Sequence, residues 1–303
     1  MADIIVIGGG TAGLTAALYA RRAGKTVTLI EKESTGGKIV FAPRIENYPG
    51  LPSVSGADYA AALTDQAEKA GVCIQYDEVS AIEPDGKGFA VRCDSGTERC
   101  RALILAVGTA NRKLGLGNEE SLVGCGVSYC AVCDGAFYSG AETAVVGGGN
   151  TALTDALFLS GICKKVTLVH RRDSFRAEQV LVDQLRAKPN VSFLLCKTVS
   201  SLHANDGELK GITVRDLKTG VEESFPLDGL FVAIGQTPQT DICRSLVDLD
   251  AAGYIRASED CVTSRPGIFA AGDCRTKSVR QLTTAAADGA VAALAACRYA
   301  DEV

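Results

Sequence analysis

The stretches DIIVIGGGTAGLTAAL (residues 3–18) and ETAVVGGGNTALTDAL (residues 142–157) share one pattern, and this pattern decides the fold. In each, an apolar segment typical of a β-strand leads into a glycine-rich turn and then into an Ala/Leu-rich segment that predicts a helix. The two stretches correspond position by position at an offset of 139 residues. The correspondence continues at the same offset from TVTLIE (26–31) to KVTLVH (165–170), so the chain contains an internal repeat.

Each turn of the repeat carries the glycine fingerprint of a dinucleotide-binding unit. The first glycine permits a tight turn, the second lets a pyrophosphate approach the backbone, and the small third residue allows the helix to pack closely on the strand. The helix N-terminus then presents free N–H groups and its positive dipole end to the phosphates. One such fingerprint is a weak signal. Two fingerprints, each after a strand and before a helix, predict two βαβ units. The fingerprint positions are Gly8, Gly10 and Gly13 in the first unit and Gly147, Gly149 and Ala152 in the second.

The two units differ in the residues that follow their second strand. The first strand ends in Glu31, whose carboxylate is placed to accept hydrogen bonds from a ribose diol. The second ends in His170, followed by Arg171, Arg172 and, one turn further, Arg176. Loss of the acid and gain of three guanidiniums predict a pocket for a 2′-phosphate. We therefore expect an ADP-ribose-like group without a 2′-phosphate in the first unit and NADP in the second.

Further apolar strands predict how the two units are closed and connected. RALILAVGTANRKLG (101–115) and DGLFVAIGQTPQT (228–240) each close one unit, and RPGIFAAGDC (265–274) is a third such strand. The predicted fold class is α/β, with two nested, doubly wound, three-layer Rossmann-like domains. Two short crossings between them suit a hinge. The predicted first domain comprises residues 1–112 and 241–303, and the second comprises the inserted residues 113–240.

Composition excludes several classes of protein. The chain has 303 residues, 47% of them hydrophobic, which is enough for two domains with separate cores. The net charge of −5 and the lack of a basic cluster argue against nucleic-acid binding. No run reaches the ~18–20 apolar residues of a membrane span. The N-terminus lacks the basic start of a signal peptide. The segment TTAAADGAVAALAAC (283–297) predicts a buried helix. We therefore expect a cytoplasmic protein without a membrane partner.

The twelve cysteines do not form a regular disulfide framework. They are spread over the whole chain, and nothing in the sequence marks a secreted protein. Most of them are therefore expected to be reduced, small apolar residues. This group comprises Cys73, Cys93, Cys100, Cys163, Cys196, Cys243, Cys261, Cys274 and Cys297.

Cys130 and Cys133 form a C-x-x-C within SYCAVCDGAFY (128–138). A structural zinc site needs about four Cys or His ligands, and the chain has only two histidines and no second C-x-x-C, so no metal is predicted. A disulfide across two intervening residues closes too small a loop to stabilise much. A redox-active pair remains, because this spacing lowers the pKa of one thiol and lets the pair open and close. Asp134 adjoins the pair as a candidate proton donor and acceptor.

Together these motifs resemble the low-molecular-weight thioredoxin reductases. The first fingerprint, CAVCDG, GGGNTA, HRRDSFRA and GIFAAGD occur in the order and spacing of that family, over essentially the whole chain. The resemblance implies FAD in the first domain, NADPH in the second, a homodimer and a redox-active cysteine pair in the inserted domain. It also implies that Cys133 meets the flavin and that Cys130 attacks the partner, an order that the residues by themselves leave open.

The resemblance assigns site residues position by position. In the family the aspartate of the GD motif, here Asp273, bonds the ribityl chain, and the RQ step lies beside the flavin. The residues implied to bind FAD are Gly8, Gly10, Gly13, Glu31, Asn47, Asp273, Arg280 and Gln281. Those implied to bind NADPH are Gly147, Gly149, Asn150, Thr151, Ala152, His170, Arg171, Arg172 and Arg176.

Several positions depart from the family pattern. Thr11 stands where proline is frequent, and Lys38 follows Gly36-Gly37 where glutamine is frequent. Thr154 and Asp155 replace paired glutamates that usually follow GGGNTA, which puts the details of the nicotinamide pocket in doubt. The phosphate-binding prediction does not depend on them.

The predicted function is transfer of electrons from NADPH through FAD and Cys130–Cys133 to the disulfide of thioredoxin or a thioredoxin-like protein. Because the dithiol and the nicotinamide site share one domain, we expect that domain to rotate between a hydride-transfer pose and a dithiol-exchange pose. Alternatives are a reductase for another small redox protein, a dithiol oxidase, a ferredoxin-dependent relative, a ferredoxin–NADP-type reductase and a non-enzymatic redox sensor. The arginines at 171, 172 and 176 argue against the oxidase and ferredoxin-dependent alternatives, since neither needs an NADPH pocket.

Overall fold

The structure, a computed structural model, describes residues 1–42 and 44–303. The chain divides into two compact units. Unit 1 comprises Met1–Ala110 and Thr237–Val303, and unit 2 comprises Asn111–Gln236. The assignment of one cofactor to each domain stays a prediction.

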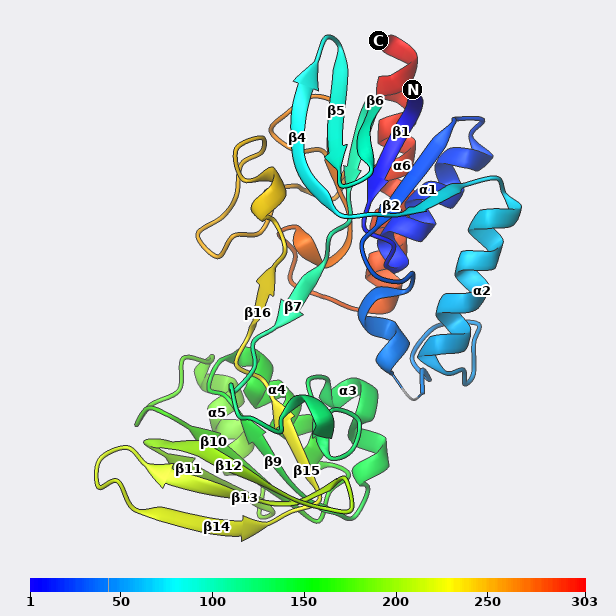
Figure 1. Cartoon of the computed structure of the whole chain (residues 1–303). Helices are drawn as coiled ribbons and strands as arrows, with labels where there is room; N and C mark the ends of the chain where they lie inside the picture. Colours follow the sequence, from blue (N-terminus) through cyan, green and yellow to red (C-terminus); the bar gives the residue numbers. More distant parts are fainter. Residues whose placement is uncertain (43) are drawn as a thin grey trace. The chain divides into compact units, whose positions relative to one another are not determined.

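Unit 1 is built on a seven-stranded sheet (Figure 1). Its parallel part has the order β3-β2-β1-β6-β17, and an antiparallel hairpin of β4 and β5 continues from the first half of β6. β6 has two neighbours along one side because it is long: Gly96–Cys100 pair with β5, and Leu103–Leu105 pair with β17. The strands are β1 (Ala2–Ile7), β2 (Val27–Glu31), β3 (Cys73–Tyr76), β4 (Val79–Asp85), β5 (Gly88–Cys93), β6 (Gly96–Leu105) and β17 (Ile268–Ala270).

Both faces of this sheet are buried, as the unbroken apolar runs predict. Ile4 and Val6 of β1 face a core formed with the helices, whereas Ile5 and Ile7 face a second core formed with β4, β5 and the loop segment before β17. The helices are α1 (Thr11–Arg22), α2 (Gly56–Lys69) and α6 (Leu282–Glu302), with 3₁₀ turns η1 (Gly37–Phe41), η4 (Asp241–Cys243) and η5 (Gly272–Cys274).

Helices α1 and α6 touch backbone to backbone. A Cβ atom at Gly289 of α6 would lie 2.3 Å from the carbonyl oxygen of Ala12, so only glycine fits there. The alanines of α6 at 292, 293, 295 and 296 are buried beside this contact. The prediction of a buried helix from the alanine-rich segment is therefore confirmed. None of the helices in the described part of the chain is long and apolar enough to cross a membrane.

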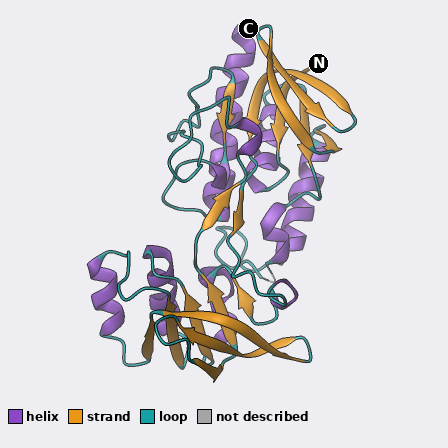
Figure 2. Ribbon diagram, turned by 60° about the vertical axis from the view of Figure 1, so that its left-hand side comes forward, coloured by secondary structure: helices purple, strands orange, loops and turns teal. Residues whose placement is uncertain are grey.

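Unit 2 repeats the same plan (Figure 2). A five-stranded parallel sheet has the order β11-β10-β9-β15-β8, and a separate antiparallel sheet has the order β12-β13-β14. The parallel strands are β8 (Val127–Ser128), β9 (Glu142–Val146), β10 (Lys165–His170), β11 (Val191–Leu195) and β15 (Gly229–Val232). The antiparallel strands are β12 (Lys197–Asn205), β13 (Glu208–Asp216) and β14 (Glu222–Pro226). The helical segments are η2 (Glu120–Leu122), α3 (Ala131–Asp134), η3 (Gly135–Tyr138), α4 (Asn150–Ser160) and α5 (Gln179–Arg186).

The two units have equivalent topologies. The order β3-β2-β1-β6 in unit 1 corresponds to β11-β10-β9-β15 in unit 2, with α1 following β1 and α4 following β9. This is the strand order of a dinucleotide-binding fold. The predicted fold class, two Rossmann-like α/β domains of which the second is inserted in the first, is confirmed.

The chain crosses between the units twice, through β7 (Thr109–Asn111) and β16 (Gln236–Pro238). These two short strands pair with each other. The amide of Arg112 donates to the carbonyl oxygen of Gly235 at 3.0 Å, and that of Gln239 donates to Gly108 at 3.1 Å. The crossings therefore form a two-stranded ribbon rather than two independent loops.

Candidate active site

The first glycine turn lies between β1 and α1 of unit 1. Gly8 has φ +102°, and a Cβ atom there would lie 2.4 Å from the carbonyl oxygen of Ala106. A Cβ atom at Gly13 would lie 1.8 Å from the carbonyl oxygen of Gly8, so the helix packs directly on the turn. At Gly10, by contrast, the nearest atom would be 3.9 Å away. The turn is thus closed by its first and third glycines and open at the second, as a pyrophosphate requires.

Glu31 at the end of β2 is fixed over this turn. One of its carboxylate oxygens accepts the N–H of Gly9 at 2.7 Å, and the other accepts the N–H of Glu33 at 2.9 Å. An ionised carboxylate offers about four lone-pair sites, so each oxygen retains capacity for a further donor. The arrangement suits the two hydroxyls of a ribose.

Asp273 lies in η5, directly after β17. Its Oδ1 is buried and has no hydrogen-bond partner among the described residues. Its Oδ2 lies 3.8 Å from the ammonium of Lys38. Because buried polar atoms are nearly always satisfied, the free oxygen marks a place for a hydroxyl donor from a ligand.

Arg280, Gln281 and Asn47 lie around the same loop. The guanidinium of Arg280 donates to the carbonyl oxygens of Asp273 at 3.2 Å and Arg275 at 3.3 Å, and it lies 4.1 Å from the centre of the Tyr254 ring. The amide of Asn47 donates to Gln281 Oε1 at 3.3 Å. The structure thus brings Asn47 and Gln281 together, while the side chain of Arg280 holds the Asp273 loop in place.

A buried charge cluster supports this loop from behind. The carboxylate of Asp288 in α6 accepts hydrogen bonds from Arg275 at 2.7 and 2.8 Å and from Lys277 at 2.9 Å. It also accepts the backbone N–H of Gly272 at 3.0 Å, which ties η5 to α6. Burial by itself raises the pKa of Asp288, but the hydrogen bonds from Arg275 and Lys277 outweigh it and hold the pKa below its ordinary value.

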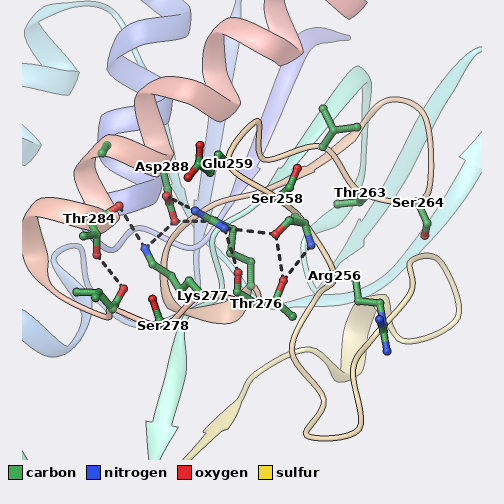
Figure 3. A pocket seen from close by; sticks show the side chains of 15 residues that line it. Arg256, Ser258, Glu259, Thr263, Ser264, Thr276, Lys277, Ser278, Thr284 and Asp288 are labelled. Atoms are coloured by element: carbon green, nitrogen blue, oxygen red, sulfur yellow. Dashed lines mark hydrogen bonds and ion pairs between the residues drawn. The ribbon is translucent and has the colours of Figure 1, made fainter.

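A cavity of about 1020 Å³ opens beside this cluster. Figure 3 shows Lys277 and Asp288 joined in its wall, with Thr284 next to them. Its other lining residues lie in the segments 256–264 and 275–287. None of the predicted site residues lines it. The cavity therefore adjoins the Asp273 loop without forming part of the predicted site.

We expect the substitution Asp288→Asn to reduce the free energy of unfolding by about 3–5 kcal/mol, because it leaves two buried cations without their carboxylate. The loss follows the sign of the pKa shift: the stabilisation is present at neutral pH and disappears as the pH falls through the lowered pKa of Asp288. Urea denaturation at pH 7 measures it. The control is Asp65→Asn, which changes an exposed carboxylate of α2. A loss for Asp288→Asn no greater than for this control would contradict the prediction.

The second glycine turn, between β9 and α4, has the same construction. A Cβ atom at Gly147 would lie 2.4 Å from the carbonyl oxygen of Ala233, whereas one at Gly149 would meet nothing within 4 Å. Ala152, the third fingerprint position, is fully buried. The side-chain amide of Asn150 donates to Glu178 Oε1 at 3.0 Å, which joins the start of α4 to the start of α5. The next residue, Thr151, is exposed on the first turn of α4.

His170 lies beneath this turn and not on its open side. A Cβ atom at Gly148 would lie 2.2 Å from the imidazole ring, so the glycine is needed to make room for the histidine. The ring stacks on Phe175 with a centroid distance of 5.5 Å, and its Nε2 lies 3.1 Å from the carbonyl oxygen of Ser174. Burial lowers the pKa of His170, and the neighbouring arginines lower it further. His170 is thus a neutral support for the turn.

Arg171, Arg172 and Arg176 surround this histidine on the surface of unit 2. All three are exposed, and the charge of each lowers the pKa of His170. The backbone N–H of Arg176 donates to the carbonyl oxygen of Gly148 at 2.7 Å, which holds this segment against the glycine turn. Within the described residues, no ion pair joins any of them to a carboxylate. Three uncompensated cations beside an open glycine turn suit a dianionic phosphate.

Thr154 and Asp155 lie on the second turn of α4, where Thr154 is exposed and Asp155 half-buried. Burial raises the pKa of Asp155 to about 6. This position therefore carries a carboxylate that takes up a proton more readily than an exposed aspartate.

Cys130 and Cys133 form a disulfide with an S–S distance of 2.10 Å. Cys130 precedes the short helix α3, and its sulfur accepts the N–H of Cys133 at 3.3 Å. The other ten cysteines are unpaired, and seven of them are buried. Burial raises the pKa of Cys243 to about 11 and that of Cys100 to about 12, which makes their thiols inert. Cys73, predicted to be a reduced, small apolar residue, is unpaired and is exposed at the start of β3.

Asp134 follows the second cysteine and is held in a protonatable state. Its Oδ2 accepts a hydrogen bond from Ser128 at 2.6 Å, while its Oδ1 is buried and has no partner in the described part of the chain. Burial raises its pKa, and the hydrogen bond from Ser128 offsets this only in part. The pair Ser128–Asp134 therefore places a proton carrier next to the disulfide.

Ser128 and Glu119 make contacts beside the cysteine pair that the sequence did not reveal. Ser128 also accepts the N–H of Cys130 at 3.0 Å, so it connects the first cysteine to Asp134. Glu119 is buried and accepts hydrogen bonds from the Tyr129 hydroxyl at 2.7 Å and from two backbone N–H groups. A serine two residues before C-x-x-C was visible in the sequence, but only the fold shows that it turns towards Asp134.

Comparison with known proteins agrees with this geometry. Residues 2–289 match the family described as pyridine nucleotide-disulphide oxidoreductase. The chain is 41% identical to a Listeria innocua protein named thioredoxin reductase over 302 residues, covering 99% of this chain and 94% of the relative. It is 40% identical to the Bacillus subtilis protein of the same name, with 99% and 95% covered.

Solved structures extend the match to three dimensions. The thioredoxin reductase of Streptococcus pyogenes superposes with a TM-score of 0.92 at 39% identity, covering 100% of this chain and 99% of the other. That of Lactococcus lactis, in the FR conformation, gives a TM-score of 0.72 at 34% identity with both chains fully covered. The predicted resemblance to the thioredoxin reductases is confirmed, and the chain belongs to the pyridine nucleotide-disulphide oxidoreductase family.

Proposed function

We propose that this chain is a thioredoxin reductase, which passes electrons from NADPH through FAD and the Cys130–Cys133 pair to the disulfide of thioredoxin. One observation carries this function. The disulfide and the partly buried carboxyl group of Asp134 lie in the same unit as an open glycine turn and three exposed arginines that form no ion pair within the described residues. A protein needs both a binding site for a phosphorylated coenzyme and a redox-active disulfide only if a nicotinamide coenzyme donates the electrons and a disulfide accepts them.

The residues of unit 1 fit FAD. The open position at Gly10 accommodates the pyrophosphate, Glu31 binds the adenosine ribose, and the free oxygen of Asp273 accepts a hydroxyl of the ribityl chain. Asn47 and Gln281 offer amide groups beside it. Bound FAD supplies a carrier that accepts a hydride from NADPH and delivers an electron pair to the disulfide. The residues of unit 1 orient the bound FAD and stabilise its charged groups.

The residues of unit 2 fit NADPH. The open position at Gly149 and the N-terminus of α4 accommodate the pyrophosphate, and Arg171, Arg172 and Arg176 bind the 2′-phosphate. His170 supports this site: its neutral ring packs against Gly148 and fixes the end of the strand that precedes the arginines. Asn150 positions the start of α4 through Glu178.

The dithiol completes the sequence of transfers. Two electrons break the Cys130–Cys133 bond and leave two thiolates, and a proton from Asp134 converts one of them into a thiol while the other stays ionised. The thiolate then attacks the disulfide of thioredoxin and forms a mixed disulfide, and a thioredoxin thiolate leaves and is protonated. The other cysteine of the pair gives its proton back to Asp134 and attacks the mixed disulfide, which re-forms the Cys130–Cys133 bond and releases reduced thioredoxin. We assign this first attack to Cys130 and the flavin-facing position to Cys133.

Asp134→Asn is expected to reduce thioredoxin-dependent turnover about 100-fold, the lower end of what a positioned acid or base contributes. The asparagine retains the hydrogen bond with Ser128 but carries no exchangeable acid proton. Reduction of the flavin by NADPH, measured by stopped flow, should be unchanged. Asp183→Asn, an exposed carboxylate of α5, is the control. Equal turnover in the two variants would remove Asp134 from the mechanism.

The two units are proposed to change their relative placement during turnover. The dithiol and the nicotinamide site both belong to unit 2, and both must reach the flavin in unit 1. The only covalent connections are β7 and β16, whose short ribbon suits a hinge. Chemical crosslinking between the units is expected to abolish turnover with thioredoxin. Full activity of a crosslinked monomeric chain would contradict rotation.

We further assign the chain to the cytoplasm, as a homodimer without nucleic-acid or membrane partners. Ten unpaired cysteines agree with a reducing compartment, and the net charge of −5 agrees with the absence of a nucleic-acid partner. Sedimentation equilibrium tests the dimer.

Thioredoxin-dependent oxidation of NADPH tests the function itself. The purified protein is expected to contain one FAD per chain and to consume NADPH rapidly, followed at 340 nm, only after oxidised thioredoxin is added. A flavoprotein that consumes NADPH equally fast without thioredoxin would be an oxidase. One that is reduced only by small dithiols or by reduced ferredoxin would have a different electron donor.

A further inference from the structure

Lys38 is a cation that the family pattern does not supply at this position, and the structure places it among the predicted FAD ligands. It lies in η1, directly after Gly36 and Gly37. Its ammonium donates to the hydroxyl of Thr109 at 2.7 Å and lies 3.8 Å from Oδ2 of Asp273. Three segments far apart in the sequence thus meet at the ammonium, all of them in unit 1.

The charges around Lys38 are unbalanced. Burial lowers its pKa, the carboxylate of Asp273 raises it, and the guanidinium of Arg280 lowers it again. Lys38 and Arg280 are therefore two cations near one carboxylate, that of Asp273. The Oδ1 atom of this carboxylate is buried and has no hydrogen-bond partner among the described residues. Arg280 is occupied by carbonyl oxygens and by the ring of Tyr254. The side chain of Lys38, 43% exposed, is the cation that remains open to a molecule bound at Asp273.

We propose that Lys38 sets the reduction potential of the bound flavin by stabilising its negatively charged reduced form. The inference rests on the proposed function, because it requires FAD at Asp273. Two electrons and one proton convert neutral oxidised flavin into a reduced form with one negative charge, and NADPH supplies both electrons and the proton as hydride. A fixed ammonium near this charge favours the reduced form, whereas an uncharged side chain does not.

The expected size follows from Coulomb interaction in a partly solvated site. One unit charge about 6 Å away, at an effective dielectric constant of about 40 (between the values for a protein surface and for bulk water), changes the equilibrium between oxidised and reduced flavin about tenfold. For a two-electron couple a tenfold change corresponds to about 30 mV. Lys38 is thus a residue that tunes the cofactor without taking part in bond making.

The test is the midpoint potential of FAD, measured anaerobically against a reference dye. Both redox cysteines are replaced by serine in all samples, so that the flavin is the only two-electron acceptor. In this background Lys38→Gln is expected to reduce the ratio of reduced to oxidised flavin about tenfold at a given ambient potential. Lys38→Met should do the same, and it replaces Lys38→Gln if that variant loads FAD poorly.

Two controls separate charge from structure. Lys38→Arg keeps the charge and is expected to stay within twofold of the parent. Lys69→Gln, at the C-terminal end of α2, removes an exposed cation from the same unit and should also have no effect. The proposal is wrong if the neutral variants bind FAD stoichiometrically with the parent's potential, and the proposed function survives that result. A parent protein that binds no FAD overturns both.

Discussion

Replacing either Cys130 or Cys133 by serine abolishes reduction of thioredoxin while leaving the flavin fully reducible by NADPH. The expected loss of turnover exceeds roughly 10³-fold, because a nucleophile that forms a covalent intermediate has no substitute among the remaining residues. The other cysteines cannot replace the pair, since most are buried and burial raises their pKa. Stopped-flow kinetics measure reduction of the flavin by NADPH, and steady-state turnover measures reduction of thioredoxin.

The two single variants also differ from each other. With Cys133→Ser, the free thiol of Cys130 is expected to attack thioredoxin and to accumulate a mixed disulfide, visible as a heavier band on a non-reducing gel. With Cys130→Ser, the remaining thiol of Cys133 faces the flavin and forms little of this product. Cys125→Ser, at an exposed cysteine of the same unit, is the control and should keep full activity. Accumulation of the mixed disulfide only in Cys130→Ser would reverse the assigned roles.

The double substitution Arg171→Ala/Arg172→Ala is expected to reduce kcat/KM for NADPH by about 10²–10⁴-fold, since each of the two charged hydrogen bonds contributes roughly 1.5–3 kcal/mol. The value for NADH should change less than about threefold, because NADH lacks the 2′-phosphate that the guanidiniums bind. Steady-state kinetics with both coenzymes at constant ionic strength measure the two effects. Most of the loss should appear in KM, because the 2′-phosphate is bound equally before and during hydride transfer.

Arg186→Ala is the matched control for this pair. Arg186 is an exposed arginine in the last turn of α5, in the same unit as the arginine cluster. The Arg186→Ala substitution removes one guanidinium charge from unit 2 and leaves the arginines at 171, 172 and 176 unchanged. Equal losses with NADPH and NADH in the double variant would show that the arginines support folding and do not read the phosphate.

The internal repeat made most of the fold predictable. Two glycine fingerprints at one offset predict two strands, two helices and the parallel order around them, and the structure has the same order in both units. The antiparallel sheet of β12, β13 and β14 was not predicted. Its strands are only partly apolar, because one face is exposed, and it has no glycine turn to mark it.

The positions of candidate site residues were predictable where the residues directly follow a parallel strand, while their roles stay predictions. Glu31 and the arginines at 171 and 172 are examples, since the ends of parallel strands meet at one edge of the sheet. His170 occupies the position equivalent to Glu31, but its ring is directed under Gly148, where the missing side chain leaves room. A sequence offset aligns positions and does not give the direction of a side chain.

Contacts between distant segments could not be predicted. Lys38 and Thr109 are 71 residues apart. Ser128 reaches Asp134 because α3 starts directly after Cys130, and its first turn brings the N–H of Asp134 to the carbonyl oxygen of Cys130. The cluster of Arg275, Lys277 and Asp288 depends on α6 lying against η5, where Asp288 accepts the N–H of Gly272. Charge patterns do not show such pairings, because neutralising partners are brought together by the tertiary fold.

The central claim is that electrons pass from NADPH to the flavin and leave through the disulfide to thioredoxin. Anaerobic absorbance at about 450 nm tests it in one cuvette. We expect NADPH to bleach the yellow protein and a subsequent excess of oxidised thioredoxin to restore the colour, with no recovery in the variant that lacks both Cys130 and Cys133. A protein that bleaches with NADPH but does not recover its colour with thioredoxin, or recovers equally without the two cysteines, would contradict the claim.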